Sequence, residues 1–479
     1  MQLASIADEA RLALATIAER AVGIVAPSLR LGVTGLARAG KTVFITALVH
    51  NLIHGGRLPL FKAYSSGRIT GAALEPQPDD DVPRFDYEQH VRDLVDERVW
   101  PDSTRRISEL RLAIRYESAT FLNRSLGRGL LNLDIVDYPG EWLLDLPLLG
   151  KDYVTWSGEA LAFARAPARQ GLAAPWLARA AAARAEARED EAVARELAAL
   201  FTAYLTACRA NDHIATEPPG RFLMPGDLAG SPALTFAPLE NAGGNPASSL
   251  GAMMARRYEA YKDAVVRPFF RDHFARLDHQ IVLVDALEAL NAGPAALGDL
   301  EAALAAILAS FRVGRAGWLT GLIARRIDRI LFAATKADHL HHGDHDRLEA
   351  ILAKVVERAI TQAKFAGAQV EVLALASVRA TREGTVTQHG ERLPSIIGTP
   401  LPGESLDGRV YDGAGEIAMF PGDLPEEAET VFSRQAETSL RFLRFRPPKL
   451  EQTAEGLSLS LPHIRLDRAL EFLIGDWLA

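Results

Sequence analysis

Eight residues near the amino terminus, GLARAGKT at positions 35–42, have the types and spacing of a phosphate-binding loop. In such a loop, backbone N–H groups surround the phosphates, a lysine neutralises the terminal ones, and a threonine hydroxyl binds Mg²⁺. The apolar residues that follow recur at helical spacing, so the start of that helix would add free amides and a favourable dipole. An ordinary glycine-rich turn is the alternative. The nucleotide contacts predicted for this loop are Gly35, Ala37, Arg38, Ala39, Gly40, Lys41, Thr42 and Val43.

Two further segments lie, in sequence order, where a phosphate-loop nucleotidase has its contacts to Mg²⁺ and the γ-phosphate. The sequence DYPG at 137–140 ends an apolar segment; Asp137 could hold Mg²⁺ through water, and the Gly140 amide could meet a γ-phosphate. Thr104 lies just before another apolar segment, where it could reach both Mg²⁺ and the γ-phosphate. We therefore expect Thr42, Thr104 and Asp137 to hold the metal, and the segment around Thr104 to become ordered with a triphosphate bound. A solvent-exposed turn is the alternative for Thr104.

Hydrolysis of a phosphoanhydride needs positioning and charge neutralisation more than covalent chemistry. Lys41 and Mg²⁺ would supply most of that. Glu141 follows Gly140, where a water-positioning residue is usual, but its charge opposes the γ-phosphate. The sequence therefore predicts slow hydrolysis unless an arginine assists, and Arg38, Arg105 and Arg106 are the candidates in the chain. Exposed surface positions are the alternative for all three.

The choice of base is indicated by TKAD at 335–338, which closes an apolar segment. A carboxylate at Asp338 can accept both N1–H and the 2-amino group of guanine, which adenine cannot match. The stem of Lys336 would cover the nucleotide. Thr335 stands where asparagine is commoner. After the next apolar segment, an amide at Ser377 or Val378 could bind guanine O6. Guanine is the predicted base, with adenine or mixed use as the alternative.

The candidate site residues follow apolar segments that are bounded by turn residues, and we expect these segments to be strands. Helical patterns separate most of them, an alternation typical of a mostly parallel α/β sheet. The segment at 109–116 differs, because its leucines and isoleucine alternate with arginine and alanine; we expect an antiparallel, half-solvated edge strand there. The predicted strands are 31–35, 109–116, 130–140, 280–287, 329–338 and 370–377.

Composition changes along the chain predict three regions. Residues 1–150 and 278–384 would form a discontinuous core of the P-loop GTPase type. An Ala-rich, mostly helical insertion would occupy 151–277. The turn-rich remainder, 385–479, would be a small α+β region that packs on the core and closes with a helix.

Whole-chain properties restrict the class of protein. The chain has 479 residues, a formal net charge of −8 and one cysteine, Cys208. The charge disfavours generic nucleic-acid binding, and the single cysteine excludes an internal disulfide. No apolar run is long enough to span a bilayer, and the amino terminus lacks the zones of a signal peptide. We expect a cytoplasmic protein, with peripheral attachment to the inner membrane and homo-oligomerisation left open.

Together these segments resemble the YcjX-like family of bacterial P-loop proteins, which are associated with stress and regarded as GTPases. The resemblance rests on GLARAGKTVFITALV, WPDST, LDIVDYPGEWLLDLPLL, TKADHL, FPGDLP and LPHIRLDRALEFLIGD, which are spread over nearly the whole chain. It implies a GTPase-like core with a helical insertion, binding of GTP and GDP, and a role in the bacterial envelope-stress response. It also implies a small membrane-protein partner encoded beside the family members.

Two segments invite other interpretations. HLHHGDHD at 339–346 could bind zinc or nickel, although a solvated entrance to a helix is the favoured interpretation. The basic amphipathic segment at 317–330 could rest on lipid or a partner, although packing on the sheet is commoner. For the whole protein, a regulatory GTPase is the leading hypothesis. The alternatives are a nucleotide-dependent scaffold with negligible turnover, and an ATPase.

Overall fold

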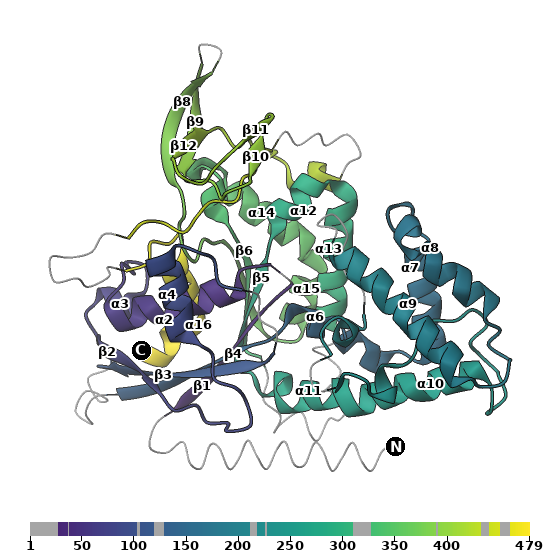
Figure 1. Cartoon of the computed structure of the whole chain (residues 1–479). Helices are drawn as coiled ribbons and strands as arrows, with labels where there is room; N and C mark the ends of the chain where they lie inside the picture. Colours follow the sequence, from purple (N-terminus) through teal and green to yellow (C-terminus); the bar gives the residue numbers. More distant parts are fainter. Residues whose placement is uncertain are drawn as a thin grey trace. The chain divides into compact units, whose positions relative to one another are not determined.

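The computed structural model (Figure 1) describes residues 27–36, 38–102, 106–118, 129–210, 218–225, 228–309, 327–388, 391–432, 440–450 and 460–479. The chain divides into two compact units, which we describe separately. The first, here called the sheet unit, comprises Met1–Pro139, Leu277–Leu297 and Ile323–Ala479. The second, here called the helical unit, comprises Gly140–Arg276 and Gly298–Leu322. The three regions expected from the sequence, with their boundaries at 150, 277 and 384, stay a prediction.

The described part of the sheet unit contains a seven-stranded sheet with the order β2-β3-β4-β1-β5-β6-β7. The pairs β4-β1, β1-β5, β5-β6 and β6-β7 are parallel, whereas β3 is antiparallel to both β2 and β4. The mostly parallel α/β sheet with an antiparallel edge is therefore confirmed. The strands are β1 (Ser28–Gly35), β2 (Ile69–Glu75), β3 (Ser108–Tyr116), β4 (Gly129–Asp137), β5 (His279–Val284), β6 (Arg329–Ala334) and β7 (Gln369–Ala374).

The strand at 109–116 was expected at the edge of the sheet, and this expectation was wrong. This strand, β3, lies between β4 and β2, so that β2 forms the edge. Leu112 and Ile114 are fully buried, and Arg111 is bound to Asp134 of the neighbouring β4 (Nε to Oδ1 2.6 Å). Arg111 therefore reflects a cross-strand ion pair rather than a solvated face. The sequence of β2, ITGAALE, has small residues and no strong apolar alternation, which explains why no strand was predicted there.

One apolar core joins the first strand of the sheet unit to the carboxyl terminus of the chain. Leu31 and Val33 of β1, Leu48 of α2 (Lys41–His54) and Leu470 of α16 (Leu466–Ile474) belong to the same buried cluster. α16 has buried leucine, alanine and isoleucine residues on one face, as an amphipathic helix covering a sheet must. The Asp467 carboxylate also accepts the backbone N–H of Leu60 at 2.9 Å. The closing helix expected from the sequence is thus part of the central core.

The other helices of the sheet unit are short or connect the strands (Figure 1). They are α3 (Lys62–Ser65), α4 (Tyr87–Arg92), α12 (Ala286–Ala292), α14 (His345–Val355) and α15 (Glu357–Phe365), with single turns at Asp93–Glu97, Ala337–His339, His342–Asp344, Ala428–Phe432 and Gly475–Leu478. α13 (Pro294–Ala309) begins in this unit and continues into the helical unit.

A small β region follows β7 in the sheet unit. β8 (Arg382–Gln388), β9 (Glu391–Gly398) and β12 (Ile417–Met419) form an antiparallel sheet with the order β12-β9-β8. β10 (Ser405–Leu406) and β11 (Arg409–Val410) form a separate hairpin. Ile396 and Phe445 are buried in a small apolar cluster of their own. The turn-rich composition of this part of the sequence is the local cause, because glycine and proline interrupt the strands, as Gly408 does between β10 and β11 and Pro400 does after β9.

The described helices of the helical unit pack around aromatic side chains. They are α6 (Gly140–Leu143), α7 (Tyr153–Ala164), α8 (Pro167–Ala182), α9 (Glu191–Ala210), α10 (Leu250–Tyr261) and α11 (Arg267–Asp272), with single turns at Leu146–Gly150, Gly220–Phe222, Pro232–Leu234, Lys262–Val266 and Phe274–Arg276. Trp156 stacks on Tyr258 with ring centroids 5.0 Å apart, and Trp176 stacks on Tyr204 at 5.5 Å. Such rings bury a large apolar area with few rotatable bonds, which suits a core built mainly from alanine-rich helices.

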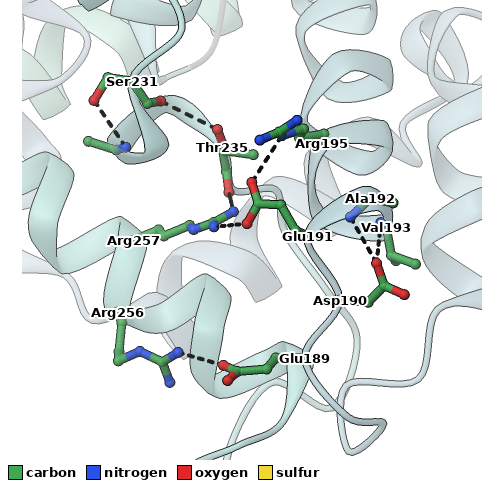
Figure 2. A network of polar contacts seen from close by, with 11 residues as sticks. Glu189, Asp190, Glu191, Ala192, Val193, Arg195, Ser231, Thr235, Arg256 and Arg257 are labelled. Atoms are coloured by element: carbon green, nitrogen blue, oxygen red, sulfur yellow. Dashed lines mark hydrogen bonds and ion pairs between the residues drawn. The ribbon is translucent and has the colours of Figure 1, made fainter.

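Polar contacts join the start of α9 to α10 (Figure 2). The Asp190 carboxylate accepts the N–H of Ala192 at 2.8 Å and so caps α9. Arg257 on α10 contacts the Glu191 carboxylate and donates to the Thr235 carbonyl oxygen at 3.0 Å. A second arginine of α10, Arg256, pairs with Glu189 at 2.7 Å. Because Arg256, Glu189 and Glu191 are exposed, these ion pairs add little to stability.

None of the helices in the described ranges is long and apolar enough to cross a membrane.

We predict that shortening a buried side chain of α16 destabilises the sheet unit. Leu470 is 1% exposed, so Leu470→Ala should lower the free energy of unfolding by about 2–5 kcal/mol through lost burial and a cavity. Leu60→Ala is the matched control, because Leu60 is 56% exposed and the same change there should stay within about 0.5 kcal/mol. Urea unfolding followed by tryptophan fluorescence measures both. Equal effects of the two substitutions would contradict the placement of α16 in the core.

Candidate phosphate and base site at the carboxyl ends of the strands

The parallel register brings the candidate loops of the sheet unit to one edge. Val33 of β1 lies opposite Asp137 of β4, and Gly35 lies opposite Leu283 of β5. Further across the sheet, Ala334 at the end of β6 pairs with the last residues of β5 and β7. The loops after these five strands therefore leave the sheet side by side. In open α/β sheets this carboxyl edge is where ligands bind.

The loop after β1 has the backbone of an anion cradle. Gly35, Arg38 and Gly40 all have positive φ, at 152°, 64° and 84°. A Cβ on Gly35 would lie 2.4 Å from the carbonyl oxygen of Leu283, so only glycine fits there. Gly40 is left-handed at the start of α2 and its carbonyl accepts the N–H of Phe44 at 2.9 Å. The first amides of α2 are thereby directed toward the loop.

The polar side chains of this loop lie where they can meet an anion. Lys41 is 7% exposed, and its ammonium donates to the carbonyl oxygens of Gly35 at 3.0 Å and Leu36 at 3.3 Å. The lysine charge therefore lies over the loop. Ala39 is buried and Val43 is half-buried, which leaves their backbone groups as the contact atoms. Ala37 lies outside the described residues.

Candidate metal ligands lie beside this loop. Asp137 is 1% exposed at the end of β4, and Thr42 is in the first turn of α2. The Thr42 hydroxyl is 3.5 Å from the carbonyl oxygen of Asp102. Thr104 lies outside the described residues, so its predicted role stays a prediction. The contact with Asp102 nevertheless brings the chain two residues before Thr104 to the first turn of α2.

The loop after β6 is held by contacts to the loops after β5 and β7. The Thr335 amide donates to Val284 at 2.9 Å, and Lys336, with φ 61°, forms an ion pair with Asp285. The Asp338 carboxylate is 4% exposed, and its Oδ2 accepts the N–H of Ala380 at 2.8 Å. Two buried carboxylates and one ammonium group therefore face this edge.

The Asp285–Lys336 pair stays charged. Burial by itself raises the pKa of a carboxyl group, but the ammonium of Lys336 and its hydrogen bond outweigh burial and lower the pKa of Asp285. Burial likewise favours a neutral Lys336, and Asp285 reverses that effect and raises the pKa of the lysine. The loop after β6 is therefore fixed by an ion pair between the largely buried Asp285 and the partly exposed Lys336.

The loop after β7 is held from the carboxyl terminus. Ser377 and Val378 are 8% and 4% exposed directly after the strand. The amide of Ala376 donates to Ile464 at 3.1 Å, and the amide of Arg379 donates to the carbonyl oxygen of Pro462 at 2.7 Å. The segment LPHIR at 461–465 thus pairs with the backbone that carries Ser377 and Val378.

Sequence reasoning missed three contributors to this edge, namely Asp285, Ala380 and the segment 461–465. A signal existed for Asp285, because it stands at the end of an apolar strand as Asp137 does. For Ala380 and 461–465 no local signal existed, because both contribute backbone groups to partners far along the chain.

Glu141 and Gly140 belong to the helical unit, where Glu141 has a partner that the sequence did not indicate. Its carboxylate is buried and pairs with Arg209 of α9 at 2.7 Å. A Cβ on Gly220 would lie 1.8 Å from the carbonyl oxygen of Glu141, so that the backbone at Gly220 approaches this residue closely. Of the arginines suggested by the sequence, Arg38 and Arg106 are exposed and Arg105 lies outside the described residues.

A second buried carboxylate fixes the segment after Glu141 within the helical unit. Oδ1 of Asp145 accepts the N–H of Gly220 at 2.7 Å, and Oδ2 accepts the hydroxyl of Tyr261 at 2.6 Å. Arg221 also lies over the Trp142 ring at 3.2 Å. Burial raises the pKa of Asp145 to about 6, although its hydrogen bonds partly offset that effect.

Comparisons with known proteins identify the family of the chain. The YcjX-like family, DUF463, matches residues 29–478. The chain belongs to the YcjX-like family. A family protein of Escherichia coli (strain K12), named Ras-like GTPase YcjX, is 39% identical over 463 residues, which cover 94% of this chain and 95% of that protein. A family protein of Shewanella oneidensis with the same name is 36% identical over 470 residues, with 94% of each chain covered. The resemblance noted from the sequence is confirmed.

We predict that Asp145 makes the stability of the helical unit depend on pH. Its pKa rises from the ordinary 3.8 to about 6 on folding, so the folded state keeps a proton that the unfolded chain releases. The contribution of Asp145 to the free energy of unfolding should therefore be fully present below pH 4 and fall by about 2–3 kcal/mol as the pH rises from 4 to above 6. Asp145→Asn keeps an acceptor for Gly220 but does not titrate. Urea unfolding at several pH values should show a flatter profile for the variant, and identical profiles would contradict the assignment.

Proposed function

We propose that this protein binds guanine nucleotides at the carboxyl edge of the sheet and acts as a regulatory GTPase. The observation that carries the proposal is the buried Asp338 carboxylate, held by Ala380 on the same sheet edge as the cradle of Gly35–Thr42. The names of the two relatives, Ras-like GTPase YcjX, support it. The proposal joins a phosphate site and a base site that are separated by about 300 residues of sequence.

The phosphates would bind in the loop after β1. The backbone amides of the loop and of the first turn of α2 donate to phosphate oxygens, and Lys41 turns its ammonium from the loop carbonyls to the terminal phosphate. Oxygen ligands suit Mg²⁺, and the Thr42 hydroxyl and the buried Asp137 carboxylate are ligands of that kind. Thr104 would be the third. When bound, Mg²⁺ would neutralise charge on the β- and γ-phosphate oxygens. The amide of Gly140, three residues after Asp137, would contact the γ-phosphate.

The base would bind between the loops after β6 and β7. One hydrogen bond from Ala380 leaves the Asp338 carboxylate with acceptor capacity for the N1–H and 2-amino groups of guanine. Adenine offers no such pair of donors, so a buried carboxylate facing it would lose its partners. The Lys336 stem would cover the nucleotide, and an amide at Ser377 or Val378 would donate to O6. These contacts argue against the alternative that the protein is an ATPase.

The Glu141–Arg209 ion pair gives the proposed water-positioning residue a counter-charge within the helical unit. An isolated glutamate would repel the γ-phosphate, whereas Arg209 compensates its charge at 2.7 Å. We propose that hydrolysis is slow and that Arg209 acts as a positioning residue through Glu141. Because Gly140 and Glu141 begin the helical unit, a change in the DYPG loop on γ-phosphate loss would be transmitted to that unit. A scaffold with negligible turnover is the second candidate, since the same ion pair engages Glu141.

The cellular role is proposed from family resemblance. A function in the bacterial envelope-stress response, a small membrane-protein partner at the inner membrane and a cytoplasmic location stay predictions, as does homo-oligomerisation. The segment 317–330 could contact such a partner or the membrane. Its residues 317–326 lie outside the described residues.

Binding calorimetry with GTP, GDP, ATP and XTP tests the base assignment. The wild-type protein should prefer GTP and GDP to ATP. Asp338→Asn should shift preference toward XTP, because an amide N–H can donate to the 2-oxo group of xanthine and still leave an oxygen for Ala380. Asp346→Asn is the matched control, since Asp346 is exposed on α14 and pairs with Arg465. Tighter ATP binding, or no shift in Asp338→Asn, would remove the residue from the base site.

Phosphate release measured with GTP separates a GTPase from a scaffold. Lys41→Ala should abolish the signal, and Arg209→Ala should lower the turnover number at least about tenfold while leaving the dissociation constant of GTP nearly unchanged. Arg195→Ala is the control, because Arg195 is exposed on the same helix and pairs with Glu191. Release at the level of the uncatalysed reaction by wild-type protein with bound GTP would favour the scaffold.

A further inference from the structure

A cluster of metal-ligating side chains lies on the sheet unit apart from the residues assigned to the nucleotide. We propose that His341, His342 and Glu383 bind a transition-metal dication of the Zn²⁺ type. In the described part of the chain, these are the side chains whose ligand atoms converge, with all three within 4.8 Å of one another. The two histidines follow β6, and Glu383 is in β8.

The distances fit coordination by one ion. Bond lengths of about 2.0–2.2 Å place two ligand atoms of a tetrahedral Zn²⁺ about 3.3–3.6 Å apart. Here Oε2 of Glu383 is 2.7 Å from Nδ1 of His342 and 3.7 Å from Nε2 of His341. These separations bracket the tetrahedral value, so small side-chain rotations would bring all three atoms to one ion. Two imidazoles and one carboxylate form a ligand set common for zinc, with the fourth position left to solvent.

The neighbouring groups leave these ligand atoms available. The amide of Gly343 donates to Nδ1 of His341 at 3.4 Å, so Nε2 is the atom of His341 directed to Glu383. Arg379 lies 3.6 Å from Oε1 of Glu383, which leaves Oε2 toward the histidines. Binding of the ion would require an ionised carboxylate at Glu383 and neutral imidazoles at His341 and His342.

The rest of the histidine-rich segment is engaged elsewhere. His345 is buried with its ring nitrogen 2.9 Å from the carbonyl oxygen of Ala337, and His339 lies edge-on to Phe445. Asp344 pairs with Arg347 at 2.9 Å, and Asp346 pairs with Arg465 at 2.8 Å. The cluster therefore differs from the one suggested by HLHHGDHD alone, because its third ligand comes from a strand 41 residues after His342.

The ion would connect the two loops that carry the proposed base site. Asp338 lies three residues before His341, and Ala380 lies three residues before Glu383. The Asp338 carboxylate accepts the N–H of Ala380, and the Thr381 hydroxyl donates to the Asp338 carbonyl oxygen. A metal bound to both segments would restrain Asp338 and Ala380 in this arrangement. This coupling rests on the proposed function, whereas metal binding itself does not.

Titration of the full-length, untagged protein with Zn²⁺ against a chromophoric chelator tests the proposal. We expect one equivalent of Zn²⁺ to bind. His342→Ala or Glu383→Gln should weaken that binding by more than about tenfold, because loss of only a hydrogen-bond partner of a ligand already lowers metal affinity by about that factor. His54→Ala and Glu416→Gln are matched controls at exposed positions outside the cluster and should bind like the wild type. X-ray absorption should show nitrogen ligands from two histidines.

Two outcomes would overturn the metal site. Absence of saturable Zn²⁺ binding would mean that the His342–Glu383 contact is an ion pair only. One equivalent that survives in both cluster variants would place the metal elsewhere. Circular dichroism of the variants establishes that they are folded. If Zn²⁺ binds as expected but chelation leaves the dissociation constant of GDP unchanged, the coupling fails while the metal site stands; if GDP does not bind at all, the proposed function fails.

Discussion

The parallel pairing of β1 with β4 and β5 is the constraint on which the candidate site depends. β1 is buried along nearly its whole length, so its register with its neighbours is fixed by side-chain packing. That register places Gly35 against the Leu283 carbonyl, where no Cβ fits, and Asp137 opposite Val33. A shift of one residue would reverse the faces of the strand and separate the loop from the carboxylate. The proposed phosphate site therefore follows from the packing of the sheet.

The carboxyl terminus of the chain stabilises the same edge. Leu470 on α16 shares the core with Leu31 of β1, and the segment 461–465 pairs with the backbone after β7. The Asn51 side chain of α2 also donates to the carbonyl oxygen of Leu461 at 3.1 Å. The proposed phosphate helix and the proposed base loop are thus both held by the last twenty residues. This explains physically why the segment LPHIRLDRALEFLIGD belongs with the nucleotide-site segments in the resemblance to the family.

Local patterns in the sequence predicted much of the fold, and long-range contacts account for what they missed. The phosphate-loop sequence and the acidic residues closing strands are short signals, and the strand-helix alternation indicated the sheet. β2 was missed because ITGAALE has little apolar alternation. Arg209, Glu383 and Ala380 were missed because each finds its partner some 40 to 70 residues away, which no local spacing reveals. The roles of the individual site residues stay predictions, and Ala37 and Thr104 lie outside the described residues.

A crystal structure of the protein with a non-hydrolysable GTP analogue and Mg²⁺ tests the central claim most directly. The account predicts that the triphosphate lies in the Gly35–Thr42 loop with Lys41 on its terminal phosphate. It also predicts that the guanine N1–H and 2-amino groups donate to the Asp338 carboxylate, which at the same time accepts the N–H of Ala380. A nucleotide bound away from this loop would contradict the account. So would a base whose Watson–Crick edge faces any group other than Asp338.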